Sequence, residues 1–373
     1  MGDKHRVRFD PVDLEIEVDE DETILDAAFR QGITLMHGCR EGQCAACKSF
    51  LLDGDLQLDR YSTFALADYE LEEGYVLLCK GHAYSDLDIE LINYDEETLR
   101  SAKPLRDLTA EVVEVAGLTH DISLLRLRPV DGVALDYHPG QYVDITIPGT
   151  SEHRSFSMAT TPATPGELEF VIKRYPGGRF SGLLEAAEGG TAGAGGTSSA
   201  GGASGIAAGD RLALRGPYGA FTLRERSERP LLFIGGGAGM APILSLLRHM
   251  AETGVDRPAV YYYGARTAAD LFYLDELKAF EGRLPGFRFV PCLSEADGDS
   301  DGDGSATGAS GGLECALGLV TEVVERGEPE LAGRDCYLCG PPPMIDAAIA
   351  LLTGAGVPPD RIFYDKCTTT APG

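Results

Sequence analysis

The chain of 373 residues lacks several features that would place it in other classes of protein. Its longest apolar tract, residues 231–247, is broken by four glycines and Pro242, so no run is long enough to span a bilayer. The first residues, Met-Gly-Asp-Lys-His-Arg, contain no apolar signal region and no N-myristoylation signal. Nine cysteines, an odd number, argue against a disulfide framework. We therefore expect a cytoplasmic protein without a membrane segment.

Positive charge is also scarce. The chain has 32 Lys and Arg against 59 Asp and Glu, a net charge of −27, and residues 1–100 hold 9 against 24. Nucleic-acid binding is excluded, because phosphate would be repelled. An acidic face favours docking to a basic patch on a redox partner. General acidity for solubility, or adaptation to salt, explains the same composition.

Four of the nine cysteines have a spacing that is typical of iron–sulfur proteins. Three stand as C-x4-C-x2-C, and the fourth follows residues 75–78, an apolar run that reads as a buried strand. This is the plant-type [2Fe–2S] pattern. Gly38 and Gly42 let the backbone turn tightly around a cluster. The predicted ligands are Cys39, Cys44, Cys47 and Cys79.

Three other interpretations of these cysteines fit less well. Structural zinc usually takes two C-x2-C knuckles, and the second is missing here. A thioredoxin-like pair at Cys44 and Cys47 would leave the other two cysteines unexplained. A Rieske centre needs two histidine ligands, whereas His37 and His82 are only sequence neighbours of the cysteines. We interpret both histidines as ordinary polar residues.

The length predicts two or three domains, and the patterns divide the chain into three. Alternating runs at 5–9 and 14–18 predict a hairpin, and a helix begins at 21–23, just before the cysteine loop. We therefore predict a multidomain protein that opens with an α+β ferredoxin domain of the β-grasp type over residues 1–103.

Residues 104–225 predict an antiparallel β-barrel, because short β-like runs follow one another with turns between them. These runs are 110–115, 122–127, 142–147, 168–173 and 211–214. A low-complexity stretch at about 189–208 is interpreted as a surface insertion with no assigned role.

Residues 226–373 predict an α/β domain with a parallel, Rossmann-like sheet, because strand, turn and helix patterns alternate. The predicted strands are 230–234, 259–263, 288–292 and 336–338, and the predicted helices are 243–252, 269–280, 318–326 and 344–354. A second insertion at about 297–312 begins like an EF-hand loop. Gly308 stands where that loop needs glutamate, so calcium binding is not expected.

Two motifs in the barrel domain are suited to a flavin. Arg154-Ser155-Phe156-Ser157 offers a fork for a diphosphate, a flat apolar ring and a hydroxyl for a ring nitrogen. Residues 177–181, with Gly178 and Ser181, precede an apolar helix start and form a phosphate cradle. Each motif alone is weak, but their order before residues 216–221 is specific.

The last domain carries small residues at two predicted strand ends. Gly235, Gly236, Gly237 and Gly239 join a buried strand to a helix, although Pro242 occupies the third glycine position of a Rossmann fingerprint. Small residues there still let a diphosphate approach the backbone. Arg266 closes the second strand, where it would contact phosphate or ribose.

The second strand end contains two cysteines followed by Gly340 and Pro341. Cys336 and Cys339 are three apart on a strand, so they face opposite sides and do not form a redox pair. Cys339 is expected to line a nicotinamide site and Cys336 to belong to the core.

Together these motifs resemble the ferredoxin–NAD(P) reductase superfamily with a plant-type ferredoxin fused at the N-terminus. The chain is most similar to reductase components of soluble di-iron monooxygenases, of the phenol hydroxylase, propane and methane type. The stretches that carry this closer match are 31–48, 154–159, 263–274 and 362–366. The family usually has an aromatic residue where Cys367 stands, and tyrosine where Phe156 stands; Phe363 or Tyr364 would replace the missing aromatic.

The resemblance implies an electron path from NADH through FAD and the [2Fe–2S] cluster to an oxygenase component. It implies that Arg154, Ser155, Phe156 and Ser157 bind the flavin, that Gly178 and Ser181 hold its diphosphate, and that residues 235–239 and 339–342 place the nicotinamide. Ser157 and Cys339 would lie at the reacting rings. FAD is needed because a flavin exchanges one or two electrons, whereas NADH gives two and the cluster takes one.

NADH is expected rather than NADPH, because Thr-Ala-Ala follows Arg266 in place of further basic residues. We expect the chain to be monomeric on its own. Two other functions fit: the reductase of a Rieske-type ring-hydroxylating dioxygenase, and a non-catalytic iron–sulfur carrier. A heme oxygenase partner is also compatible, and the substrate of the oxygenase is not readable from this chain.

Overall fold

A computed structural model describes residues 2–130, 132, 134–164, 166–189, 205–295, 305–306 and 314–367. The chain forms two compact units. One contains Met1–Leu105 together with the Pro217–Arg224 segment, and the other contains Arg106–Gly216 and Glu225–Cys367. The Pro217–Arg224 segment follows the barrel in sequence but packs within the first unit.

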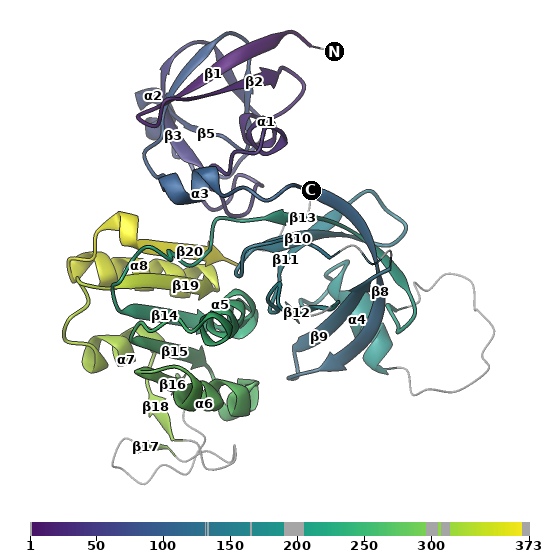
Figure 1. The fold of residues 1–373 in the computed structure, drawn as a ribbon, viewed down its shortest axis with the longest axis vertical. Helices are drawn as coiled ribbons and strands as arrows, with labels where there is room; N and C mark the ends of the chain where they lie inside the picture. The colour runs from purple at the N-terminus through teal and green to yellow at the C-terminus, as the bar shows by residue number, and fades with distance from the viewer. Residues whose placement is uncertain are drawn as a thin grey trace. The chain divides into compact units, whose positions relative to one another are not determined.

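The first unit is a small sheet that packs against one helix, as a β-grasp domain does (Figure 1). The five-stranded sheet has the order β2-β1-β7-β3-β5, and β4 pairs with β6. Its strands are β1 (Lys4–Asp10), β2 (Leu14–Asp19), β3 (Lys48–Asp53), β4 (Leu56–Leu58), β5 (Tyr75–Leu77), β6 (Gly81–Ala83) and β7 (Leu87–Glu90). Its helices are α1 (Ile24–Arg30), α2 (Asp68–Glu73) and α3 (Glu96–Arg100).

Helix α1 begins where the sequence predicts it. The Thr23 side chain accepts a hydrogen bond from the Asp26 backbone N–H and so caps the helix. Ile24 and Leu25 are buried against Val7 and Phe9 of the sheet. The apolar face of the helix therefore fixes the position from which the cysteine loop starts.

The second unit begins with a six-stranded antiparallel barrel of order β11-β10-β13-β8-β9-β12. A bridge between Met158 and Phe170 joins the two ends of this order, so the sheet nearly closes on itself. The elements are β8 (Arg106–Gly117), β9 (Ile122–Pro129), β10 (Tyr142–Thr146), β11 (His153–Ser157), β12 (Leu168–Lys173), α4 (Ser181–Gly189) and β13 (Arg211–Tyr218).

A parallel sheet completes the second unit, with the order β17-β18-β16-β15-β14-β19-β20. Helices α5 and α6 cover one face and α7 and α8 the other (Figure 1). The strands are β14 (Leu231–Gly236), β15 (Ala259–Ala265), β16 (Phe287–Leu293), β17 (Ser305–Ala306), β18 (Cys315–Leu317), β19 (Asp335–Gly340) and β20 (Ile362–Lys366). The helices are α5 (Met240–Thr253), α6 (Leu274–Arg283), α7 (Val320–Gly327) and α8 (Pro342–Gly354). The chain order reverses between β14 and β19, which is where doubly wound sheets bind ligands.

The predicted architecture is confirmed, and the elements differ in detail. The residues around Arg154 follow β10 and themselves form a barrel strand, β11, which the sequence patterns did not predict. The helix predicted over 269–280 begins only at Leu274, because Tyr273 has a left-handed backbone with φ 56° that interrupts it. Strands β17, β18 and β20 were not predicted. Most of both insertions, 189–208 and 297–312, lies outside the described residues. Among the helices that the structure describes, none combines the length and the hydropathy needed to cross a membrane.

Candidate functional site

The predicted cluster ligands come together in the first unit, in the loop after α1 and at the end of β5. Backbone N–H groups point at their sulfurs: Glu41 and Gln43 donate to Cys39 Sγ at 3.4 and 3.3 Å, and Cys39 donates to Cys44 Sγ at 3.3 Å. Gly38 lies close to the same sulfur, since a Cβ there would be 3.0 Å from Cys44 Sγ. Donors of this kind stabilise thiolate sulfur.

The four thiols lie in two pairs. The Cys39 and Cys44 thiols are hydrogen-bonded to each other. This hydrogen bond, together with the backbone donors, lowers the pKa of Cys39 to about 6. The Cys47 and Cys79 thiols are hydrogen-bonded to each other, and this hydrogen bond together with burial raises the pKa of Cys47. In the described ranges, no group of three or more His, Cys, Asp or Glu side chains is arranged around a single metal ion. Two pairs suit a cluster of two irons better, since each iron takes two of the four thiolates.

His37 has a role that its sequence neighbourhood did not reveal. It is buried, its Nδ1 bonds to the Leu35 carbonyl at 2.7 Å, and its Nε2 accepts the Gly219 N–H at 2.7 Å. Burial lowers the pKa of His37 to about 4, so the ring is neutral. It is not an ordinary polar residue: it ties the cysteine loop to the Pro217–Arg224 segment.

A second contact joins the same two segments. The Arg40 guanidinium carbon lies 3.7 Å from the centroid of the Tyr218 ring, and Phe29 of α1 packs on that ring as well. His82, in contrast, bonds to the Glu20 carbonyl and to Asp59. Neither histidine therefore stands as a Rieske ligand.

The first flavin motif lies on β11, the edge strand of the barrel order. Side chains alternate along a strand, so Arg154 and Phe156 share one face while Ser155 and Ser157 share the other. Phe156 packs at the edge of the barrel core, with its ring centroid 4.9 Å from that of Phe180. The ring is half-buried, and Ser157 is half-buried at the end of the strand.

The second flavin motif meets the first at Glu152. The Arg179 guanidinium donates to Glu152, and Arg154 Nη2 lies 3.5 Å from the same carboxylate. Two arginines from separate motifs thus converge on one anionic group, which is the charge that a diphosphate presents. The Ser155 hydroxyl is engaged elsewhere, since it donates to Asp144 at 2.7 Å.

The turn before α4 is compact. A Cβ at Gly178 would lie 2.2 Å from Ser181 Oγ, so a side chain there would displace the Ser181 hydroxyl. The Ser181 hydroxyl accepts the Tyr175 N–H at 3.3 Å and donates to the Tyr175 carbonyl at 3.1 Å. The hydroxyl therefore closes the turn. At the start of α4 the Gly182 and Leu183 N–H groups donate to the Gly178 and Phe180 carbonyls at 2.8 and 3.1 Å.

Glycines stand together at the carboxyl ends of three adjacent strands in the parallel sheet. Gly236 of β14 is level with Gly264 of β15, and a Cβ on Gly340 of β19 would lie 3.3 Å from the Gly236 backbone. A Cβ at Gly239 would lie 2.2 Å from the Cys339 carbonyl oxygen. These glycines form a floor of closely packed backbone at the switch point, the place where doubly wound sheets bind ligands.

Cys336 and Cys339 separate as predicted. Cys336 belongs to the apolar core of the sheet. The Cys339 thiol, at the end of β19, is hydrogen-bonded to the Cys367 thiol. The Cys367 backbone N–H donates to the Gly340 carbonyl at 2.9 Å. This thiol contact and burial raise the pKa of Cys339.

The two aromatics predicted to replace the missing one are engaged within the sheet. Phe363 lies against Tyr337, with ring centroids 4.8 Å apart, and Tyr364 packs on the core of the parallel-sheet domain. Within residues 362–367, Cys367 is therefore the residue whose side chain contacts Cys339.

Arg266 extends from the end of β15 and its side chain is 62% exposed. Its Nε lies 3.9 Å from Asp270, whose carboxylate also accepts the backbone N–H and hydroxyl of Thr267. A carboxylate beside this arginine would repel a 2′-phosphate, which favours NADH.

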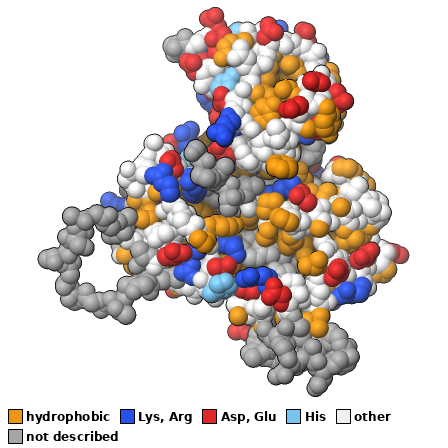
Figure 2. Space-filling model, turned by 180° about the vertical axis from the view of Figure 1, so that it is seen from behind, with side chains coloured by type: hydrophobic (Ala, Val, Ile, Leu, Met, Phe, Trp, Pro, Cys, Tyr) orange, Lys and Arg blue, Asp and Glu red, His pale blue; other side chains and the backbone are white. Residues whose placement is uncertain are grey.

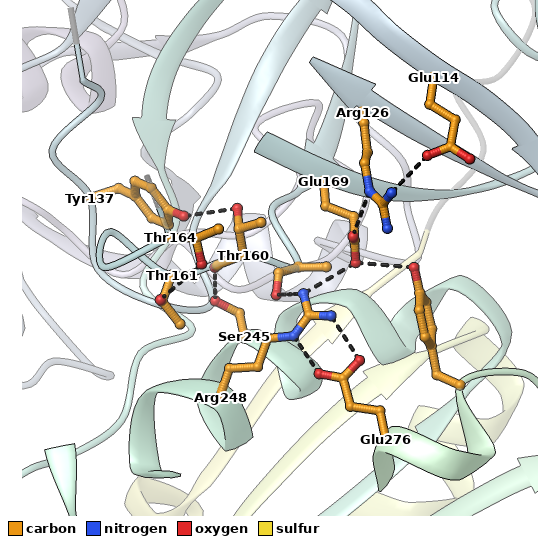
Figure 3. A network of polar contacts seen from close by, with 12 residues as sticks. Glu114, Arg126, Tyr137, Thr160, Thr161, Thr164, Glu169, Ser245, Arg248 and Glu276 are labelled. Atoms are coloured by element: carbon orange, nitrogen blue, oxygen red, sulfur yellow. Dashed lines mark hydrogen bonds and ion pairs between the residues drawn. The ribbon is translucent and has the colours of Figure 1, made fainter. Parts of the chain in front are cut away.

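The sequence patterns missed a network that joins the barrel to the parallel sheet. Its centre is Glu169 of β12, which is buried and bonds to Arg126 and to Arg248 (Figure 3). No spacing signal marks these residues, because they are brought together from β9, β12 and α5 by folding alone.

Comparisons with known proteins divide the chain as the motifs do. Residues 7–83 match the 2Fe-2S iron-sulfur cluster binding domain family, 109–223 the oxidoreductase FAD-binding domain family, and 233–349 the oxidoreductase NAD-binding domain family. The three matches follow the order of the predicted cofactor sites.

The chain is also similar to whole proteins. It is 54% identical over 371 residues to the reductase component of propane 2-monooxygenase from Rhodococcus jostii (strain RHA1), covering 100% of this chain and 93% of the relative. It is 34% identical to the toluate 1,2-dioxygenase electron transfer component of Pseudomonas putida, covering 95% of each. The crystal structure of the Amycolatopsis cytochrome P450 reductase GcoB superposes with a TM-score of 0.74 at 29% identity, covering 97% of this chain and 98% of that one.

Proposed function

This chain belongs to the ferredoxin–NAD(P) reductase superfamily, among the members that carry an N-terminal 2Fe-2S domain, and we propose that it is the reductase component of a propane-type di-iron monooxygenase. It is an oxidoreductase whose cofactors are NADH, FAD and a [2Fe–2S] cluster. The observation that carries the proposal is the match to the propane 2-monooxygenase reductase along the whole chain. The toluate dioxygenase relative matches over a similar length at 34% identity. The solved structure is that of a cytochrome P450 reductase, at 29% identity. Both are less similar to this chain than the propane 2-monooxygenase reductase.

The proposed cluster ligands are Cys39, Cys44, Cys47 and Cys79. Two hydrogen-bonded pairs of thiols support this set, Cys39 with Cys44 and Cys47 with Cys79, and three backbone N–H groups point at the sulfurs of Cys39 and Cys44. These donors stabilise negative charge on sulfur, which raises the tendency of a bound cluster to accept an electron.

The proposed flavin site lies between β11 and the turn before α4. Arg154 and Arg179 supply positive charge for the diphosphate, and the positive end of the α4 helix dipole adds to it. Phe156 offers the exposed part of its ring, and Ser157 ends the strand with a hydroxyl that can bond to a ring nitrogen. When bound, FAD supplies the exchange between two-electron and one-electron transfer that the other two cofactors require.

The proposed nicotinamide site is the glycine floor at the ends of β14, β15 and β19. Gly235, Gly236, Gly237 and Gly239 form the turn before α5, where small residues let a diphosphate approach the backbone, and Gly340 and Pro341 follow at the end of β19. Cys339 stands beside this floor and Arg266 at its rim. None of these residues is required to act as an acid or a base; their role is to bind and orient.

Reconstitution with a purified propane-type oxygenase component tests the proposal. The reductase chain, loaded with FAD and iron–sulfur cluster, should support NADH-dependent oxidation of propane. Ferricyanide reduction by NADH serves as the control for an active reductase. A reductase that reduces ferricyanide but never supports the di-iron oxygenase, and instead drives a Rieske-type or heme oxygenase, would refute the proposed partner.

A further inference from the structure

One buried carboxylate joins the two halves of the second unit. Glu169 of barrel strand β12 is 5% exposed, and Figure 3 shows it between side chains from both halves. Arg126 Nε of the barrel donates to it at 3.1 Å, Arg248 Nη1 of α5 at 3.1 Å, and the Tyr273 hydroxyl before α6 at 3.0 Å. Buried charge is costly unless it is paired, and here each partner is a donor.

Arg248 is held from both sides. Its Nε and Nη2 donate to the two carboxylate oxygens of Glu276 on α6 at 2.7 and 2.9 Å, while its Nη1 also reaches the Ala159 carbonyl at 2.9 Å (Figure 3). Burial disfavours the charged form, but Glu276 and Glu169 raise the pKa of Arg248. A bidentate arginine has little freedom to shift, so α5 is fixed to β12 and to the loop after β11.

A stripe along α5 makes further contacts with the same loop. The Ser245 hydroxyl donates to the Thr160 carbonyl at 2.6 Å and accepts the Gly140 N–H at 3.3 Å. About two turns further along, Glu252 accepts a hydrogen bond from the hydroxyl of Thr161 at 2.6 Å. Ser245, Arg248 and Glu252 are three and four residues apart, so they share one face of the helix.

This face connects the two proposed sites through rigid elements. Helix α5 begins directly after the Gly235–Gly239 turn, and residues 159–161 directly follow β11, which carries Arg154 to Ser157. A rotation of α5 on the barrel would therefore move the nicotinamide floor against the flavin strand. Reaction rates are sensitive to such movement, since a misplacement of about 1 Å costs on the order of 100-fold.

We propose that Glu169 is a positioning residue for hydride transfer: through Arg248 and Tyr273 it holds the nicotinamide-binding turn in register with the flavin-binding strand. The inference rests on the proposed placement of FAD at β11 and of the dinucleotide at the end of β14. Glu169 contacts neither cofactor in this arrangement, and acts through α5.

The chain contains a matched control for this residue. Glu328 is also buried and is also bonded by two arginines and a tyrosine, namely Arg288, Arg334 and Tyr262. All four lie within the parallel-sheet domain, away from the barrel. Glu169→Gln and Glu328→Gln thus remove the same charge from equivalent surroundings, but only the first lies between the two domains.

The test uses the full chain loaded with FAD and cluster. Stopped-flow measurement of flavin bleaching by NADH gives the rate at saturating NADH and the apparent Kd separately. Glu169→Gln should lower the saturating rate by about tenfold or more and change the Kd by less than about twofold. Glu328→Gln should leave both the saturating rate and the Kd within about twofold of the wild type. It should lower the thermal midpoint about as much as Glu169→Gln does.

Ser245→Ala provides a milder second variant, because alanine suits a helix and the loss is limited to the two hydroxyl bonds. It should lower the saturating rate by about threefold. Wild-type rates in both Glu169→Gln and Ser245→Ala, or an equal loss in Glu328→Gln, would overturn the positioning role. A wild-type chain that binds FAD yet is not bleached by NADH would instead refute the proposed function.

Discussion

At the residue scale, the same side chain does different chemistry according to its hydrogen bonds. Burial raises the pKa of Cys336, in the core of the parallel sheet, to about 12, which leaves an inert thiol. The Cys44 thiol and the Gln43 and Glu41 N–H groups lower the pKa of Cys39 to about 6. The donors around Cys39 therefore favour its thiolate, whereas hydrogen bonds between the thiols and burial raise the pKa of Cys44 and of Cys47.

His37→Leu should destabilise the first unit. The imidazole satisfies the Leu35 carbonyl and the Gly219 N–H, and leucine would leave both buried without a partner. We expect the free energy of unfolding, measured by urea denaturation of the holoprotein, to fall by about 1–3 kcal/mol. His37→Gln can accept and donate in the same positions and should lose less. Equal midpoints for His37→Leu and wild type would contradict this role.

The residue scale also shows what spacing can and cannot predict. The four cysteines were predictable, since their ligand role depends on a local loop and one later strand. The role of His37 was not, because its partner Gly219 is 182 residues away in sequence. Glu169 and Arg248, 79 residues apart, were missed for the same reason.

At the element scale, backbone without side chains forms the proposed nicotinamide site. Gly236, Gly264 and Gly340 lie at the ends of three neighbouring strands. Gly239, directly before α5, lies close to the β19 backbone. The sheet brings these glycines together from distant parts of the chain. Their small size, rather than any charged group, is what a diphosphate requires of this edge.

Gly239→Ala should weaken NADH binding. Its Cβ would lie 2.2 Å from the Cys339 carbonyl oxygen, so β19 or the turn must move. We expect the apparent Kd for NADH, from stopped-flow flavin reduction, to rise by about tenfold or more. Gly282→Ala on α6 meets nothing within 4 Å and should leave the Kd unchanged. An unchanged Kd in Gly239→Ala would place the dinucleotide elsewhere.

Elements were predictable where their pattern was strong. Buried strands such as β14 and β15 are continuous apolar runs, and α5 begins after a clear glycine turn. Strand β20 has only five residues, three aromatic or apolar ones followed by two charged ones, and it becomes a strand because β19 offers it an edge. Helix α6 begins later than predicted because Tyr273 has a left-handed backbone. This conformation usually indicates glycine, so no residue type in the sequence signals it here.

At the scale of the whole molecule, negative charge dominates. The chain carries a net charge of −27, and Figure 2 shows acidic side chains among apolar ones on one face of the first unit. Exposed apolar side chains of that unit include Phe64 and Tyr69. Such a surface attracts a basic partner over a distance that salt shortens.

Electron transfer to the oxygenase component should therefore slow as salt rises. Between about 0.05 and 0.5 M NaCl we expect the bimolecular rate to fall by about tenfold, because screening removes the attraction. The transfer from flavin to cluster within the chain is the control and should stay within about twofold. A bimolecular rate that does not change with ionic strength would show that the acidic charge serves another purpose.

The central claim is that one chain carries electrons from NADH through FAD to a [2Fe–2S] cluster held by four cysteines. Anaerobic mixing with NADH, followed by EPR, tests it most directly in the wild type and in Cys79→Ser. The account predicts flavin bleaching in both, and a reduced-cluster signal in the wild type alone. A bleached wild type without that signal, or the same signal at full strength in Cys79→Ser, would contradict it.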